Sequence, residues 1–284
     1  MKNVSPWLHQ LNKEREVKKL DSDIETDVAI VGGGIAGVAT AFFILKSTIK
    51  SVTLLEGGRI GHGATGYNAG QLVSYLARPF HDLVKEFKPE LVVEAHRAIE
   101  ETAWELMDVM YTEARLDISL SRFTGHLGFT SKDHLYPLLE DNVLRAKYGM
   151  NPKEVLIADH ADFIKDAEGK FPGMFRVAPK EEILSRLETK ESEFIACLSE
   201  QKGVMNSALF TEKIAEYLLK NYPDRFFLYE HTHINKVALH EDYVVLDAGN
   251  HTVRSWKTVL CTNGFDNITI FDKSGLEIDT RFHH

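Results

Sequence analysis

The pattern of hydrophobic and polar positions predicts a strand, a turn, a helix and a second strand early in the chain. Val28–Val31 is a short apolar run that breaks into three consecutive glycines. The apolar run Ile35–Leu45 has helical length, and after a polar turn the run that begins at Ser51 ends in Glu56. Short apolar runs bounded by glycine are typical of buried strands, whereas longer runs favour helices. The stretch therefore predicts one half of a dinucleotide-binding sheet.

Longer amphipathic patterns follow this stretch. Pro89 begins a run in which apolar residues recur at three- and four-residue steps as far as Met110, which predicts a helix with proline at its first position. The range 122–130 predicts a strand and 131–148 predicts a helix. The range 157–171 is a mixed polar segment to which the pattern assigns no element.

The last third of the chain predicts short strands around one helix. A strand at 194–199 is expected to turn at 201–203, and Asn206 and Ser207 are expected to cap a helix that runs through Leu219. Gly249-Asn250 has the composition of a hairpin turn. The other predicted strands are 226–229, 234–239, 243–246, 252–256 and 258–262.

The order of the elements predicts an α/β fold with an α+β insertion. We expect an N-terminal arm at 1–26, a discontinuous Rossmann-like domain at 27–78 and 205–266, and a helical and mixed-sheet domain at 79–204 and 267–284. A simple NAD dehydrogenase continues directly with further βα units. The interruption therefore favours FAD.

Composition and charge narrow the class of protein. A net charge of −9 argues against nucleic acid as a partner, since phosphates require a basic face. Cys197 and Cys261 lie far apart and have no metal-ligand spacing, so we expect no metal site and a reducing, cytoplasmic setting. The uncharged range 28–45 approaches the length of a membrane span, but its glycines and the dinucleotide interpretation argue for a soluble protein without a transmembrane segment.

The glycine spacing carries the candidate chemistry. Gly32, Gly34 and Gly37 form G-x-G-x-x-G, and Glu56 lies roughly twenty residues further on, where a ribose-binding acid belongs. The first glycine permits a tight turn, the second lets the backbone approach a pyrophosphate, and the third allows close packing of helix and strand. The helix N-terminus adds free N–H groups. The alternative is a glycine-rich turn that binds nothing.

The loop that follows Glu56 is rich in glycine and alanine from Gly57 to Gly70. Its backbone must pass close to something or turn repeatedly. Such a loop is suited to enclosing the rest of a large cofactor. Arg59 is a candidate for meeting a phosphate, and a plain surface arginine is the alternative.

At the sequence GATGYNAGQ the chain resembles the D-amino-acid oxidase family of FAD-dependent oxidoreductases, the group of glycine and sarcosine oxidases. The resemblance is strong from Asp27 to Gln71 and looser from Asn206 to Gly264. It is nearest the gamma-glutamylputrescine oxidase branch, whose members often carry an N-terminal aromatic arm like Pro6-Trp7. It implies that FAD is the cofactor and that these residues hold it: Gly32, Gly34, Ile35, Ala36, Gly37, Glu56, Gly57, Arg59, Gly63, Ala64, Thr65, Asn68, Ala69, Gly70, Gln71, Ile234, Thr262, Asn263 and Gly264.

The chain departs from the family pattern in two places. Tyr67 stands where relatives often have arginine and where some have a histidine joined covalently to FAD, so we expect non-covalent binding, with His62 as an outside candidate for a bond. Members of the family continue well beyond Gly264, whereas this chain ends at Arg281–His284. We therefore expect a C-terminally truncated chain with an incomplete substrate domain.

The resemblance implies an oxidoreductase that removes hydride from the carbon bearing the amine of a small amine or amino acid. The family's substrate-carboxylate arginine belongs to the absent portion, so no catalytic residue is assigned. A catalytically inactive FAD-binding module and a nicotinamide-dependent dehydrogenase remain the alternatives. Substrate, electron acceptor and oligomeric state are not determined.

Overall fold

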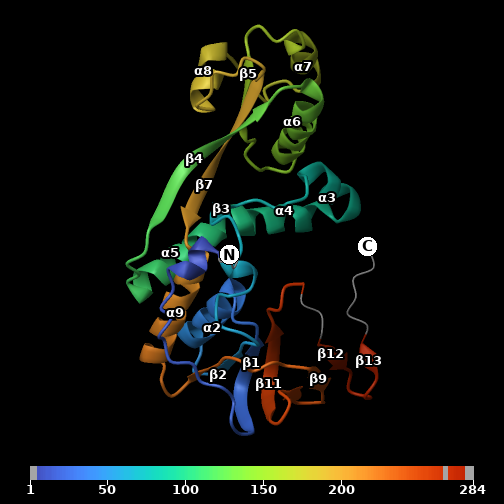
Figure 1. Ribbon diagram of the computed structural model, residues 1–284. Coiled ribbons are helices and arrows are strands. Elements are labelled where there is room, and N and C mark those ends of the chain that lie inside the picture. The colour runs from blue at the N-terminus through green and yellow to red at the C-terminus, as the bar shows by residue number, and fades with distance from the viewer. Residues whose placement is uncertain (1–4, 265–267, 279–284) are drawn as a thin grey trace. The chain divides into compact units, whose positions relative to one another are not determined.

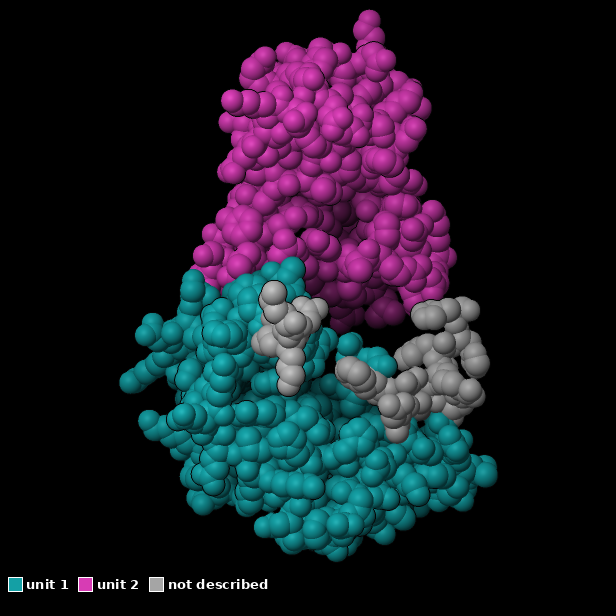
Figure 2. Space-filling view, viewed as in Figure 1, with its two compact units in different colours: residues 1–70, 110–119, 205–284 teal, residues 71–109, 120–204 magenta. Residues whose placement is uncertain are grey.

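The computed structural model describes residues 5–264 and 268–278, and the chain forms two compact units (Figure 2). Unit 1 contains Met1–Gly70, Met110–Ser119 and Met205–His284, and unit 2 contains Gln71–Val109 and Leu120–Val204. The truncation expected from the sequence concerns the end of the chain at Arg281–His284, which lies outside the described residues.

The sheet of unit 1 is built around β1 (Ile24–Val31), which pairs in parallel with β2 (Val52–Leu55) and with β11 (Thr252–Leu260) (Figure 1). The strand order is β13-β12-β9-β10-β11-β1-β2-β8. The remaining elements of this sheet and its helices are α2 (Ile35–Ser47), η1 (Ala64–Gly66), α9 (Ser207–Asn221), β8 (Phe226–Tyr229), β9 (Lys236–Leu239), β10 (Val244–Asp247), β12 (Thr269–Phe271) and β13 (Glu277–Ile278).

The apolar runs of the sequence fill the core of unit 1. Ala29 and Ile30 at the centre of β1 are fully buried, as strands enclosed on both faces must be. Helices α2 and α9 pack against each other, and Phe42 and Phe210 lie among their fully buried side chains. Asn206 caps α9 as predicted, because its side chain accepts a hydrogen bond of 2.9 Å from the amide of Leu209.

The start of the described chain lies on unit 1. The short helix α1 (Pro6–His9) places the indole N–H of Trp7 2.6 Å from the carbonyl of Asn68, to which it donates. Leu8 and Leu11 are buried against Ala208 of α9. The N-terminal arm therefore contacts both the glycine-rich loop and the helix behind it.

The sheet of unit 2 has the strand order β3-β7-β5-β6, with β4 paired to β7. Leu135 and Leu139 of its longest helix pack with Val155 and Ile157 in its main hydrophobic cluster. Its elements are β3 (Gln71–Val73), α3 (Phe80–Glu86), α4 (Pro89–Arg97), the π-helical turn η2 (Ala98–Thr102), α5 (Ala103–Ala114), which enters unit 1 at Met110, β4 (Leu120–Phe129), α6 (Lys132–Lys147), β5 (Glu154–Ala158), α7 (Ile164–Lys170), β6 (Arg176–Ala178), α8 (Lys180–Arg186) and β7 (Ala196–Met205).

Three predictions of local structure are wrong. The expected turn at 201–203 does not exist, since β7 runs unbroken from Ala196 to Met205. The two strands expected at 252–256 and 258–262 are the single strand β11. The polar segment 157–171 contains the end of β5 and all of α7.

The predicted domain division stays a prediction, and the compact units have other bounds: 71–78 lie in unit 2, and 110–119 lie in unit 1. The described residues of 267–284 lie in unit 1, because β12 pairs in parallel with β9 and extends the sheet of that unit. In the part of the chain that the structure describes, no helix is long and apolar enough to cross a membrane.

Candidate nucleotide-binding site

Unit 1 contains a cavity of about 610 Å³ at the carboxyl ends of β1, β2 and β11. In open α/β sheets this edge is the usual place for a ligand. The cavity brings together segments more than 200 residues apart in the sequence. It is lined by Val31, Gly32, Gly34, Ile35, Ala36, Leu55, Glu56, Gly57, Gly58, His62, Gly63, Ala64, Thr65, Asn68, Thr232, His233, Ile234, Cys261, Thr262, Asn263 and Ile268.

The glycine turn between β1 and α2 forms the wall of this cavity nearest the sheet. Gly32 has φ +107°, a backbone conformation that favours glycine, and a Cβ there would lie 2.5 Å from the carbonyl oxygen of Cys261. A Cβ on Gly37 would lie 1.9 Å from the carbonyl oxygen of Gly32. Gly37 therefore does not line the cavity but lets α2 approach the turn, as the spacing predicts.

The N-terminus of α2 supplies hydrogen-bond donors to the cavity. The first N–H groups of a helix have no acceptor within it and carry the positive end of the helix dipole. The amide of Ile35 donates to the hydroxyl of Thr65 at 3.0 Å. Among the described residues, the amides of Ala36 and Gly37 have no acceptor. The amide of Ala36, which lines the cavity, fits an anionic group such as a phosphate.

Glu56 lies at the end of β2 with both carboxylate oxygens hydrogen-bonded. One oxygen accepts from the amide of Gly33 at 2.6 Å and the other from the amide of Gly58 at 2.7 Å. Two backbone amides therefore fix the carboxylate in one orientation. Each oxygen keeps further acceptor capacity for a ligand hydroxyl, which the ribose interpretation requires.

The loop after β2 is held by the side chain of Asn68. Its amide nitrogen donates to the carbonyl of Thr65 at 2.8 Å and to the hydroxyl of Ser207 at 2.9 Å, and its oxygen accepts from the amide of Gly70. These bonds attach the loop to the start of α9. Asn68 therefore determines the path of the loop as well as lining the cavity.

Six predicted site residues do not line the cavity: Gly37, Arg59, Ala69, Gly70, Gln71 and Gly264. Gln71 is exposed on β3 and belongs to unit 2. The Nε atom of Arg59 is buried without a hydrogen-bond partner, and no ion pair to its guanidinium occurs among the described residues. The other thirteen predicted residues do line the cavity, and their contact with a cofactor stays a prediction.

Several lining residues were not predicted. Thr232 and His233 precede Ile234, and Cys261 precedes Thr262. Their position next to these predicted residues is the one feature of the sequence that could have identified them. Burial raises the pKa of the Cys261 thiol, which keeps it protonated beside the glycine turn. Nothing in the sequence around Ile268 indicated a role.

Two residues bear on how a cofactor is attached. Tyr67, in the position where some relatives carry a covalent histidine, is 63% exposed and does not line the cavity. His62 does line it, and its Nδ1 atom lies 2.9 Å from the carbonyl oxygen of Ile60.

Comparison with known proteins gives a family and a fold. A family model described as DAO, FAD dependent oxidoreductase, matches residues 27–279. The gamma-glutamylputrescine oxidoreductase of Escherichia coli is 37% identical over 76 residues, which are 27% of this chain and 18% of that protein. The match thus spans less than a fifth of that curated relative.

Solved structures share the fold at low sequence identity. The glycine oxidase of Geobacillus kaustophilus matches with a TM-score of 0.58 and 17% identity, over 89% of this chain and 68% of that one. The L-proline dehydrogenase of P. horikoshii matches with a TM-score of 0.60 and 15% identity, over 86% of this chain and 55% of that one. The predicted fold class is confirmed.

Proposed function

The chain belongs to the DAO family of FAD-dependent oxidoreductases, and from this premise we propose that the unit 1 cavity binds FAD non-covalently and that the protein oxidises the C–N bond of an amine or amino acid. The observation that supports the binding site most directly is the amide of Ala36 at the N-terminus of α2, unpaired among the described residues, in a cavity that Glu56 also lines.

The residues that line the cavity fit the parts of FAD. The amide of Ala36 is a donor for a pyrophosphate. Glu56, fixed by two backbone amides, is an acceptor for the adenosine ribose. Ile234, Thr262 and Asn263 also line the cavity. The loop after β2 contributes Gly63, Ala64, Thr65 and Asn68 to the lining.

The proposed substrate class rests on the relatives. The E. coli protein is named for an amine substrate, and the solved relatives are named for glycine and L-proline. When bound, FAD supplies a hydride acceptor at N5 for the carbon that bears the amine. This chain's residues bind and orient the cofactor, and none of them is assigned a proton-transfer role.

A charged side chain introduced at position 36 tests the proposed FAD site and should leave the fold intact. Ala36 is exposed, lines the cavity and lies in the first turn of α2, where an acidic side chain favours the helix. Ala36→Glu should nevertheless weaken FAD binding about tenfold or more, because its charge repels a pyrophosphate. Ala36→Gln has the same shape without the charge and should bind nearly as the wild type does. Titration by flavin fluorescence measures both, and equal affinities would contradict the proposed site.

Reduction of bound FAD tests the reaction. The FAD-loaded protein, mixed anaerobically with a panel of primary amines, secondary amines and amino acids, should lose its flavin absorption with at least one of them. A protein that binds FAD and is reduced by none would be an inactive binding module. A colourless protein that binds NADH instead would support the nicotinamide alternative.

A further inference from the structure

Unit 2 contains a second cavity, of about 380 Å³, which we call the unit 2 cavity. Every residue that lines it belongs to unit 2, so it is separate in sequence from the FAD site and the inference below does not depend on FAD binding. Its volume is at the small end of the range of ligand pockets, about 300–1,000 Å³. Such a cavity fits a small organic molecule.

One face of the paired strands β4 and β7 forms the floor of the unit 2 cavity. Leu127 and Phe129 alternate along β4, and Leu198, Glu200 and Lys202 alternate along β7. Phe80 of α3 adds a buried aromatic ring to the lining. Most of this surface is apolar, which suits the hydrocarbon part of a ligand.

The absence of a side chain at Gly125 leaves space for the side chain of Lys202 on this face of the sheet. A Cβ at Gly125 would lie 2.6 Å from Cδ of Lys202 and 3.3 Å from its Cε. The lysine stem therefore lies across the backbone of β4 where a side chain is missing. Its ammonium group has no ion pair or hydrogen bond among the described residues.

The other charged side chains around the cavity are compensated. Arg145 makes two hydrogen bonds of 2.8 Å to Glu100, and Lys153 pairs with Glu200. The carboxylate of Asp141 accepts from the ring of His81 at 2.6 Å. Arg78 pairs with Glu86 at 2.7 Å. Lys202 is thus the cation that remains without a counter-charge in the described lining.

His96 is a second group without a partner at the unit 2 cavity. It is 5% exposed, and its Nε2 atom is buried with no hydrogen-bond partner. Its Nδ1 atom lies 3.6 Å from Glu100, which belongs to the π-helical turn η2. π-helical turns recur at functional sites. A buried imidazole without a partner is costly unless a ligand provides one.

We propose that the unit 2 cavity binds a small organic carboxylate with an apolar body. The carboxylate compensates the ammonium of Lys202 and accepts a hydrogen bond from Nε2 of His96. The apolar body lies on Leu127, Phe129 and Leu198.

Calorimetric titration of the full, FAD-loaded chain tests this proposal with phenylacetate as the probe. Phenylacetate should bind saturably with one site per chain. Phenylacetamide has the same shape without the charge, and inorganic phosphate has charge without an apolar body, so each should bind at least about tenfold more weakly. Equal affinity for the amide or for phosphate would overturn the proposal, as would the absence of phenylacetate binding.

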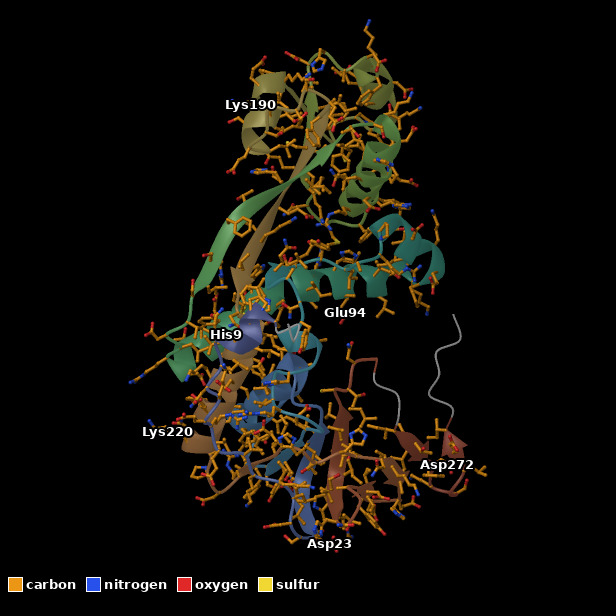
Figure 3. All side chains as sticks on the ribbon, in the orientation of Figure 1. His9, Asp23, Glu94, Lys190, Lys220 and Asp272 are labelled. Carbon is orange, nitrogen blue, oxygen red and sulfur yellow. The ribbon has the colours of Figure 1, made fainter. Side chains whose placement is uncertain are left out.

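Variants locate the binding within the chain. Lys202→Met keeps the length of the stem and removes the charge, and it should weaken phenylacetate binding about tenfold or more. Lys220→Met, at an exposed position on α9 of unit 1 (labelled in Figure 3), is the matched control and should leave the affinity unchanged. Unchanged affinity in Lys202→Met would exclude the unit 2 cavity, and circular dichroism of both variants verifies that they are folded.

Discussion

At the scale of single residues, the surroundings constrain Gly37 by steric contact and Glu100 by charge. Gly37 is required by steric contact alone, since the backbone of Gly32 occupies the space of a side chain. Glu100 depends on charge, since it is partly buried and bound by Arg145 and close to His96. The sequence predicted the first from its motif and gave no indication of the second.

Gly37→Ala should destabilise unit 1 by about 3 kcal/mol or more, because the new methyl group would meet a backbone oxygen that cannot move away. Gly169→Ala is the matched control. Gly169 also lies within a helix, α7, but a Cβ there meets nothing within 4 Å, so alanine should be neutral or slightly stabilising. Urea unfolding followed by circular dichroism measures both, and equal midpoints would show that the close approach of α2 is not required.

Glu100 should contribute to stability in acid. Burial opposes its ionisation, but the nearby imidazole of His96 and the hydrogen-bonded guanidinium of Arg145 outweigh burial and lower the pKa of Glu100 from 4.5 to about 2. A carboxyl whose pKa is lowered by folding stabilises the protein above pH 4.5, and this contribution is lost as the pH falls towards 2. The free energy of unfolding should therefore fall more steeply over this window in the wild type than in Glu100→Gln. Parallel pH profiles would count against the ion pair.

At the scale of elements, the sequence predicted helices better than long strands. The Gln-Lys-Gly segment at 201–203 has the composition of a turn, but a Cβ on Gly203 would lie 2.9 Å from the ring of Trp104 and 3.0 Å from the carbonyl oxygen of Ser121. Glycine is there for close packing within a continuous strand. Likewise β11 is one strand because it pairs along the whole length of β1. Partners distant in sequence decided both cases.

The N-terminal arm should stabilise unit 1 through Arg15. Its guanidinium lies 2.6 Å from Glu230 and 3.5 Å from Glu212, and both carboxylates are almost fully buried. Arg15→Met removes the cation and leaves two buried carboxylates, which should cost about 3–5 kcal/mol. Lys13→Met, at an exposed position of the same arm, should have little effect. Thermal and urea unfolding compare the two, and a similar small loss in both would show that the arm is dispensable.

At the scale of the whole molecule, the proposed FAD cavity and the unit 2 cavity lie in different units of the described chain. The larger one is lined only by unit 1 and the smaller one only by unit 2. The sequence predicted thirteen of the residues that line the larger cavity: ten lie in the motif and the loop that follows it, and Ile234, Thr262 and Asn263 were implied by the family resemblance. It predicted none of the smaller cavity, because the charge pairs Arg145–Glu100 and Lys153–Glu200 join segments that have no local pattern.

Amide hydrogen exchange should show that FAD binds to the unit 1 cavity and not to unit 2. Addition of FAD should slow exchange in the segments that line the unit 1 cavity, 32–36, 56–68, 232–234 and 261–263, and should stabilise unit 1 by about 2.7 kcal/mol at a concentration one hundred times Kd. Strands β5 and β7 of unit 2 should exchange at the same rate with and without FAD. Protection confined to unit 2 would contradict the assignment of the cavity.

The sequence by itself determined the strand, glycine turn and helix from Val28 to Leu45, the acid at Glu56 and the family, because each depends on the spacing of neighbouring residues. The family resemblance implied Ile234, Thr262 and Asn263, but only the tertiary structure showed how distant residues reach the site. Parallel pairing of β11 with β1 brings Cys261 and Thr262 beside Gly32, and a β-strand carries no local signal for the partner it will choose. The same holds for Nζ of Lys202 and Nε2 of His96, which have no hydrogen-bond partner among the residues that the structure describes.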